Sequence, residues 1–289
     1  MEQIKKVLVL GCKGMAGHVI KTHLESLGTY EIWGLARDAT HQNNIINLDI
    51  SNTKELEHAL NNESFDVVIN CIGLLNNTAE NNPELAIWFN GYLPHLLALL
   101  GKKYSFKLIH ISTDCVFSGD EGGYEEDSFK NGVGFYAQSK ALGEVVNSKD
   151  LTLRTSIIGP EINPNGIGLF HWFMNQSEDI SGYTDSIWSG VTTIELARVI
   201  DLSIRKDLIG LHHITNNKSI NKYELIKLFK KYSGKDINIS AVGGKKSDKS
   251  FVDTRNLLDY KIPSYDQMIY EMIELIRVND SLYSKYNIK

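Results

Sequence analysis

The stretch Val7-Leu8-Val9-Leu10-Gly11-Cys12-Lys13-Gly14-Met15-Ala16-Gly17 decides the fold of this 289-residue chain. Its four leading apolar residues predict a buried strand, and the glycines that follow open a helix predicted over 15–27. Gly11 can make the tight turn, Gly14 lets the backbone approach a pyrophosphate, and Gly17 lets helix and sheet pack closely. Glycines also end strands for structural reasons, but this position favours dinucleotide binding by Gly11, Gly14, Met15 and Gly17.

Apolar strands alternate with helices through the first half of the chain. Strands are predicted over 30–36, 65–71, 107–113 and 151–158, and helices over 52–60, 84–104 and 135–147. This alternation predicts an α/β fold, a Rossmann-type doubly wound parallel sheet with right-handed crossovers. Loops containing Gly, Pro and Asn follow, with a last helix predicted over 263–278. We expect an NAD(P)-binding domain over 1–159. Residues 160–289 should form mainly a smaller, partly interleaved substrate domain, with some segments returning to the Rossmann core.

Composition excludes several classes of protein. The net charge is −5, and no segment combines basic residues with aromatic ones, so we expect no nucleic-acid partner. The N-terminal apolar run stops at Gly11, too soon for a signal peptide, and the run over 93–100 is too short to span a membrane. We therefore expect a cytoplasmic protein. Cys12, Cys71 and Cys115 lie far apart, which predicts reduced thiols with neither a disulfide nor a metal site.

The end of the second predicted strand bears on the choice of dinucleotide. Arg37 can pair with a 2′-phosphate and favours NADPH; alternatively, Arg37 is solvated and Asp38 holds the ribose of NADH. Asp49 and Ile50 follow a short third strand, where they are placed to take the adenine amino group and cover its face. Capping of the next helix by Asp49 is an equally good explanation.

Three polar side chains carry a possible chemistry. Thr113 ends an apolar strand, where ligands of such sheets bind, and we expect it to hold a developing oxyanion. Tyr136 and Lys140 lie four apart on one helical face, where an ammonium can stabilise a phenolate. Each signal alone has a structural alternative. A threonine at a strand end can stabilise a turn, and a tyrosine and lysine four apart can form a solvated pair. His110, between two isoleucines, is expected to be a core histidine rather than a base.

The order of glycine loop, Ser/Thr and Tyr-x-x-x-Lys resembles that of the short-chain dehydrogenase/reductases, and residues 154–159 resemble their extended branch, which acts on nucleotide sugars. Within that branch, the segments 83–90, 112–119 and 123–127 are similar to motifs of the dTDP-4-dehydrorhamnose reductase family. The chain also departs from that family. Cys115 replaces its usual tyrosine, Asn70-Cys71-Ile72-Gly73 replaces its N-A-A segment, and 189–193 lacks its proline.

The resemblance implies NAD(P)H-dependent reduction of the C4 ketone of a nucleotide-linked 6-deoxy-hexulose in cell-surface polysaccharide synthesis, with NADPH (or NADH) as cofactor. Tyr136 would donate the proton, Thr113 would hold the same oxygen, and Lys140 would bind the nicotinamide ribose. The segment Cys71, Ile72 and Gly73 would lie over the cofactor, and Cys115 and Trp188 near the hexose. The resemblance also allows a homodimer.

Two other classes stay open. One is an epimerase or dehydratase that holds NAD tightly as an internal redox relay. A dehydratase would want a glutamate after Asp114, where this chain has Cys115. The other is a non-catalytic member of the fold, against which the retention of Thr113, Tyr136 and Lys140 argues.

Overall fold

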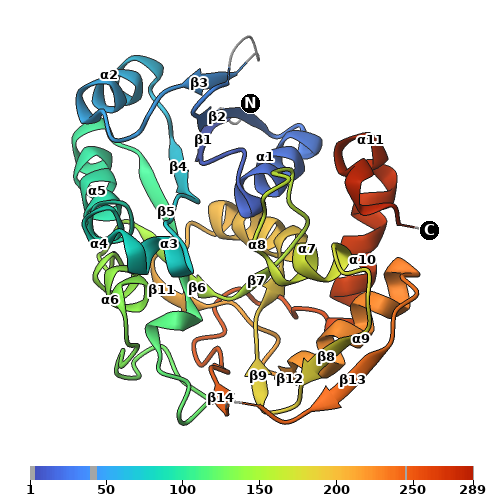
Figure 1. The fold of residues 1–289 in the computed structure, drawn as a ribbon. Coiled ribbons are helices and arrows are strands. Elements are labelled where there is room, and N and C mark those ends of the chain that lie inside the picture. Colours follow the sequence, from blue (N-terminus) through green and yellow to red (C-terminus); the bar gives the residue numbers. More distant parts are fainter. Residues whose placement is uncertain (1–3, 40–43, 245, 289) are drawn as a thin grey trace.

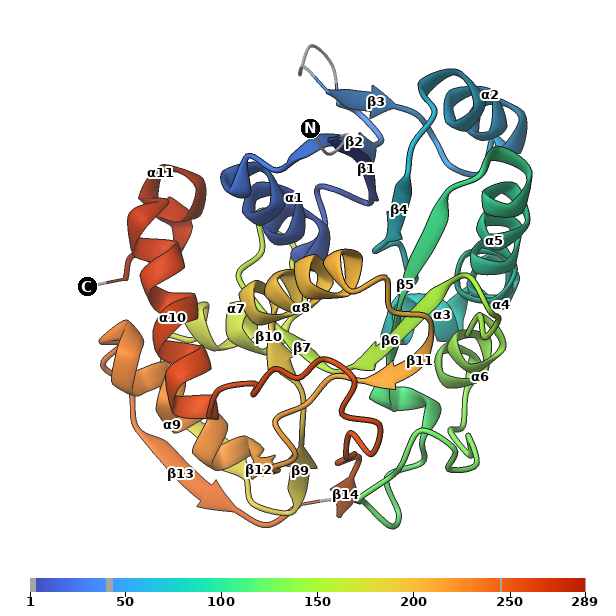
Figure 2. The ribbon, with the colours of Figure 1, turned by 180° about the vertical axis from the view of Figure 1, so that it is seen from behind.

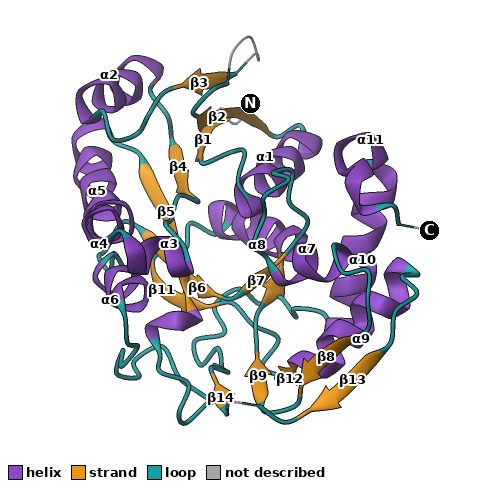
Figure 3. Cartoon of the chain, viewed as in Figure 1, coloured by secondary structure: helices purple, strands orange, loops and turns teal. Residues whose placement is uncertain are grey.

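The centre of the computed structural model is a seven-stranded sheet, and the structure describes residues 4–39, 44–244 and 246–288 (Figures 1 and 3). The strand order is β11-β6-β5-β4-β1-β2-β3, and all neighbouring strands are parallel. Its strands are β1 (Lys5–Leu10), β2 (Tyr30–Ala36), β3 (Ile45–Asn47), β4 (Val67–Asn70), β5 (Lys107–Thr113), β6 (Leu151–Thr155) and β11 (Gly210–His213). The doubly wound parallel sheet is confirmed, and its order reverses between β1 and β4, where such sheets bind ligands.

Helices cover both faces of the sheet (Figure 2). The buried residues of β1 show why, because Val7 and Val9 belong to one hydrophobic core and Leu8 and Leu10 to the other. The first core includes side chains of α1 (Met15–Leu27) and α8 (Thr193–Arg205), and the second includes those of α2 (Thr53–Glu63) and α5 (Leu93–Tyr104). A strand buried on both faces is apolar throughout, which is the pattern of 7–10.

Some predicted elements have other boundaries. The helix predicted over 84–104 consists of α4 (Pro83–Ala86), the π-helical turn η1 (Ile87–Tyr92) and α5, and a short helix, α3 (Asn76–Asn81), precedes it. The helix predicted over 135–147 is α6 (Phe135–Leu142). It ends at Gly143, where a Cβ would lie 1.8 Å from the carbonyl oxygen of Asn90. The strand predicted over 151–158 breaks at Ser156, because the chain leaves the sheet there and β7 (Ile157–Ile158) pairs with β10 (Val191–Thr192).

The later segments form smaller sheets and helices at one end of the main sheet (Figure 1). They are α7 (Leu169–Met174), β8 (Ile180–Tyr183), β9 (Ser186–Trp188), β12 (Ile220–Asn221), α9 (Lys222–Ser233), β13 (Ile239–Val242), β14 (Ser247–Asp248), α10 (Tyr265–Val278), α11 (Asp280–Tyr283) and η3 (Ser284–Tyr286). Two late elements lie with the main sheet, since β11 is its edge strand and α8 packs on α1. The domain boundary at 159/160 stays a prediction. Within the described ranges, none of the helices has the length and apolarity needed to cross a bilayer.

Candidate active site

A cavity of about 940 Å³ opens at the carboxyl ends of β1, β4 and β5. Its walls come from the loop before α1, the segment after β4, helix α6 and the later segments of the chain. Residues of the predicted site that line it are Gly14, Met15, Cys71, Ile72, Gly73, Thr113, Cys115, Tyr136, Lys140 and Trp188. The fold therefore brings the glycine loop and the proposed catalytic side chains to one place.

The glycine loop has the geometry of an anion site. Gly11 turns with a φ of +74°, and a Cβ on Gly17 would lie 2.2 Å from the carbonyl oxygen of Gly11. Both positions therefore require glycine. Gly14 begins α1, whose N-terminus has no side-chain cap and no acidic residue in its first turn. The backbone N–H groups there fit a pyrophosphate, because neither a capping side chain nor a carboxylate of the first turn occupies the helix N-terminus.

The predicted adenosine-side residues lie outside the cavity lining. Arg37 is exposed, with its guanidinium 3.8 Å from the carboxylate of Asp49. Asp49 accepts hydrogen bonds from the N–H and hydroxyl of Ser51, which lower its pKa, and Asn52 rather than Asp49 caps α2. The side chain of Ile50 is buried in the core, so it cannot cover an adenine ring as expected. Only the backbone of Ile50 remains for such a contact.

Thr113 and Tyr136 form the reactive end of the cavity. Thr113 ends β5, where its Oγ1 donates to the carboxylate of Asp114 at 3.0 Å and accepts the N–H of Cys115 at 3.1 Å. Burial raises the pKa of Tyr136, the nearby Cys115 raises it further, and a hydrogen bond with Thr113 opposes the shift. Tyr136 is therefore a protonated phenol at neutral pH, the form that can donate a proton.

Lys140 is held in place by the backbone and side chains around it. Its Nζ donates to the carbonyl oxygen of Ile111 at 2.7 Å and lies 3.5 Å from Nε2 of His110. Burial lowers the pKa of Lys140 to about 8, while Glu144 and Cys71 act in the opposite direction. Lys140 is directed at the backbone here, and the expectation that it stabilises a phenolate of Tyr136 together with the positive ring of a bound cofactor stays a prediction.

Two residues outside the predicted set of site residues hold this arrangement together. The carboxylate of Glu80, on α3, accepts the N–H groups of Phe135 and Tyr136 at 3.0 Å each. The side chain of Asn90, in the π-helical turn, makes two hydrogen bonds with the backbone of Leu74. Asn90 belongs to a motif that the resemblance contained, whereas a single exposed glutamate gives no signal in one sequence.

The other end of the cavity belongs to the later segments. Trp188 is almost fully buried and donates its indole N–H to the hydroxyl of Ser156 at 2.7 Å. Lys222 and Lys249 also line the cavity and supply positive charge, with Lys249 close enough to Cys115 to lower the pKa of its thiol. Burial dominates that thiol, however, and raises its pKa to about 11. It stays neutral at physiological pH.

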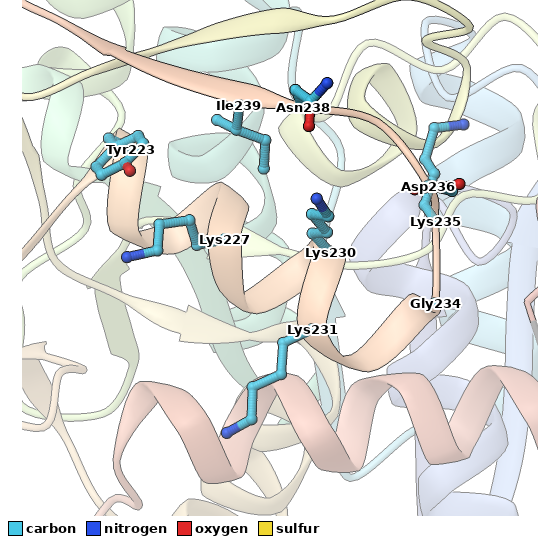
Figure 4. Close-up of a pocket in the computed structure, with 9 residues that line it drawn as sticks. All are labelled: Tyr223, Lys227, Lys230, Lys231, Gly234, Lys235, Asp236, Asn238 and Ile239. Atoms are coloured by element: carbon cyan, nitrogen blue, oxygen red, sulfur yellow. The ribbon is translucent and has the colours of Figure 1, made fainter.

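A second, more open cavity of about 730 Å³ lies on α9 and β13 (Figure 4). Lysines line it, but Lys227 and Lys231 leave α9 in different directions and form ion pairs with Glu224 and Asp266. None of the predicted site residues is part of this lining. In the part of the chain that the structure describes, no group of His, Cys, Asp and Glu side chains gathers as metal ligands. The larger cavity, which gathers the predicted site residues, is therefore the candidate active site.

Comparison with known proteins agrees with the geometry. A family model described as the RmlD substrate binding domain matches residues 5–254. The chain is 26% identical over 243 residues to a spore coat polysaccharide biosynthesis protein, SpsK, of Bacillus subtilis, covering 82% of each protein. It is 24% identical over 231 residues to a dTDP-4-dehydrorhamnose reductase of Aggregatibacter actinomycetemcomitans, covering 76% of each. The fold is similar to that of a dTDP-4-dehydrorhamnose reductase from Bacillus anthracis solved with NADP, with a TM-score of 0.81, 22% identity and coverage of 95% and 99%.

Proposed function

The chain belongs to the RmlD substrate binding domain family, and we propose that it is an NAD(P)H-dependent reductase of the 4-keto group of a nucleotide-linked 6-deoxy-hexulose in cell-surface polysaccharide synthesis. One observation carries the proposal. The half-buried, protonated phenol of Tyr136 lies with Thr113 and Lys140 in the same cavity as the glycine loop. A proton donor beside a dinucleotide site is what reduction of a ketone requires.

Each side chain has a role that its contacts support. A bound nicotinamide supplies the hydride. Tyr136 gives its phenolic proton to the oxygen of the reduced ketone, and Thr113 holds the same oxygen once its single hydroxyl hydrogen turns from Asp114 toward it. Lys140 has N–H groups beyond the one that Ile111 accepts, and these bind the nicotinamide ribose.

Positive charge for the nucleotide diphosphate comes from Lys222 and Lys249, which line the cavity. Arg255, another cation of the later segments, is engaged elsewhere, because its guanidinium donates to Asp127 and to the carbonyl oxygen of Leu211. Lys218 and Lys246 do not line the cavity, and Lys245 lies outside the described residues. NADPH as the preferred form, a cytoplasmic location and a homodimer stay predictions.

The test is turnover with candidate 4-keto sugar nucleotides, followed by the absorbance of NAD(P)H. Net oxidation of the cofactor is expected. Rearrangement of the sugar without net oxidation would instead show an epimerase or dehydratase, and no reaction with any candidate would support a non-catalytic protein.

The matched variant is Tyr136→Phe, which removes only the transferred proton. It should keep cofactor binding and lose turnover by about 10²–10⁴-fold. Tyr270→Phe, at an exposed tyrosine on α10, serves as the control. Turnover like that of the wild type in a folded Tyr136→Phe protein would exclude the mechanism.

A further inference from the structure

His110 is a buried histidine that the proposed mechanism does not use. It lies in β5, next to β4, and no part of it reaches solvent. Its Nδ1 is 3.2 Å from Nδ2 of Asn70, and its Nε2 is 3.5 Å from Nζ of Lys140. A core histidine was expected here, but this ring connects the sheet to the proposed catalytic lysine.

The orientation of Asn70 decides where the proton of His110 resides. Ile72 donates its backbone N–H to Oδ1 of Asn70 at 3.1 Å, so the amide oxygen faces Ile72 and the NH₂ group faces His110. An amide NH₂ group is only a donor. Nδ1 of His110 must therefore accept, and the proton of the neutral ring must lie on Nε2.

The ring is held neutral by its surroundings. Burial lowers the pKa of His110 well below its ordinary value, and the positive charge of Lys140 lowers it further, as does that of His95. His110 therefore directs an N–H dipole at Nζ of Lys140. An ammonium has no lone pair with which to accept it, whereas a neutral amine has one.

Other groups around Lys140 also act on its protonation equilibrium. Glu144 and Cys71 favour the charged form, but Arg154 holds Glu144 through two hydrogen bonds of 2.8 and 2.7 Å. The titratable groups that face Lys140 and His110 from the neighbouring elements are Cys71, His95, Tyr136 and Glu144.

We propose that Asn70 fixes His110 as the tautomer protonated on Nε2, and that His110 thereby acts as a positioning residue that favours the neutral form of Lys140. This inference rests on the proposed function, in which Lys140 works beside Tyr136. It assigns His110 an electrostatic effect and no proton transfer of its own.

The first test reads the tautomer directly in the wild-type protein and needs no turnover. In ¹⁵N-histidine-labelled protein, the His110 signals, assigned from their loss in His110→Leu, should show a protonated Nε2 and a bare Nδ1 throughout pH 6–8. Asn70→Asp should move the proton to Nδ1, because a carboxylate can only accept when ionised. A wild-type ring protonated on Nδ1, or one that titrates in this range, would overturn the proposal.

The second test measures the direction in which the pH profile of kcat shifts. His110→Leu removes the N–H dipole, so the pKa of Lys140 should rise. The alkaline limb of the kcat profile should then move up by about half to one pH unit. A histidine that accepts a proton from Lys140 would give the opposite sign, and a downward shift or none would contradict the proposal. His58→Leu, at an exposed histidine on α2, is the control. Wild-type protein without turnover on any keto sugar would instead count against the proposed function.

Discussion

The carboxylate of Glu80 accepts the backbone N–H of Tyr136 at 3.0 Å, so a residue of α3 caps the helix that carries the proposed proton donor. The second oxygen accepts the N–H of Phe135. Gly134 makes the approach possible, because it has a φ of +93° and a Cβ there would lie 2.6 Å from Glu80. Helix α3 follows directly on the segment that lines the cavity over the cofactor site, which links the two walls of the site.

Replacing Glu80 should therefore disturb Tyr136 from a distance. Loss of a helix cap costs about 1 kcal/mol, and we expect Glu80→Ala to lower kcat about fivefold with little change in KM. Glu80→Gln should lie between, since its amide can accept only one of the two bonds. Glu84→Ala, at an exposed glutamate on α4, is the control. Steady-state kinetics and a thermal melting curve separate an effect on turnover from an effect on folding. An unchanged kcat would mean that Glu80 contributes to stability alone.

Arg37 gives a prediction about the cofactor. Its guanidinium lies at the end of β2, exposed and 3.8 Å from Asp49. Arg37→Ala should weaken NADPH binding about tenfold more than NADH binding, because only NADPH has a phosphate for a charge-assisted hydrogen bond. Fluorescence titration with both cofactors measures this difference in affinity. Lys54→Ala, at an exposed lysine on α2, is the control. Equal weakening of both would make Arg37 a solvated loop residue.

Lys140 should cost the protein stability at neutral pH. Its pKa falls from 10.5 to about 8 on folding, chiefly through burial. The unfolded chain then binds more protons between these values, so the cost is complete below pH 8 and disappears as the pH rises through 10.5. The fall corresponds to about 3 kcal/mol, from which the lost bond to Ile111 subtracts about 1 kcal/mol.

Lys140→Met should therefore raise the free energy of unfolding by about 2 kcal/mol at pH 7 while abolishing turnover. Urea unfolding at pH 7 and pH 10 provides the measurement. The advantage of the variant should shrink at pH 10, and Lys102→Met, at an exposed lysine on α5, should show neither effect. A variant less stable than wild type at pH 7 would contradict the prediction.

The parts of the fold that were predicted correctly depend on local signals. The bounds of α1, β2 and β5 agree with the sequence, because apolar runs and flanking glycines define them. The break at Ser156 and the π-helical turn at 87–92 could not be predicted in this way. Each serves a partner distant in the chain, Trp188 in one case and Leu74 in the other.

The same distinction holds within the site. Thr113, Tyr136 and Lys140 were found from their order and spacing, and the structure places all three in one cavity. The hydrogen bonds that orient the site were not predicted, because Glu80 lies 56 residues from Tyr136 and Asn70 lies 40 residues from His110. Without the fold, no pattern in a single sequence joins them.

The choice of sugar should depend on Cys115. The resemblance implies a place near the hexose for this residue. It lies in the turn η2 (Asp114–Val116), from which it lines the cavity, beside Lys249. Its neutral, small side chain leaves room for a bulky substituent, and a tyrosine there would fill that room and offer a hydroxyl to a plain 6-deoxy sugar.

Cys115→Tyr should therefore favour dTDP-4-dehydrorhamnose over UDP-linked 2-acetamido-4-keto sugars. The ratio of their kcat/KM values should rise about tenfold, which is the size of effect that a change of pocket shape produces. NADPH affinity should stay nearly constant, since Cys115 is not part of the glycine loop, and its titration is the internal control. An unchanged ratio would mean that Cys115 does not contact the hexose, and the buried Trp188 on the opposite segment would become the better candidate for selecting the sugar.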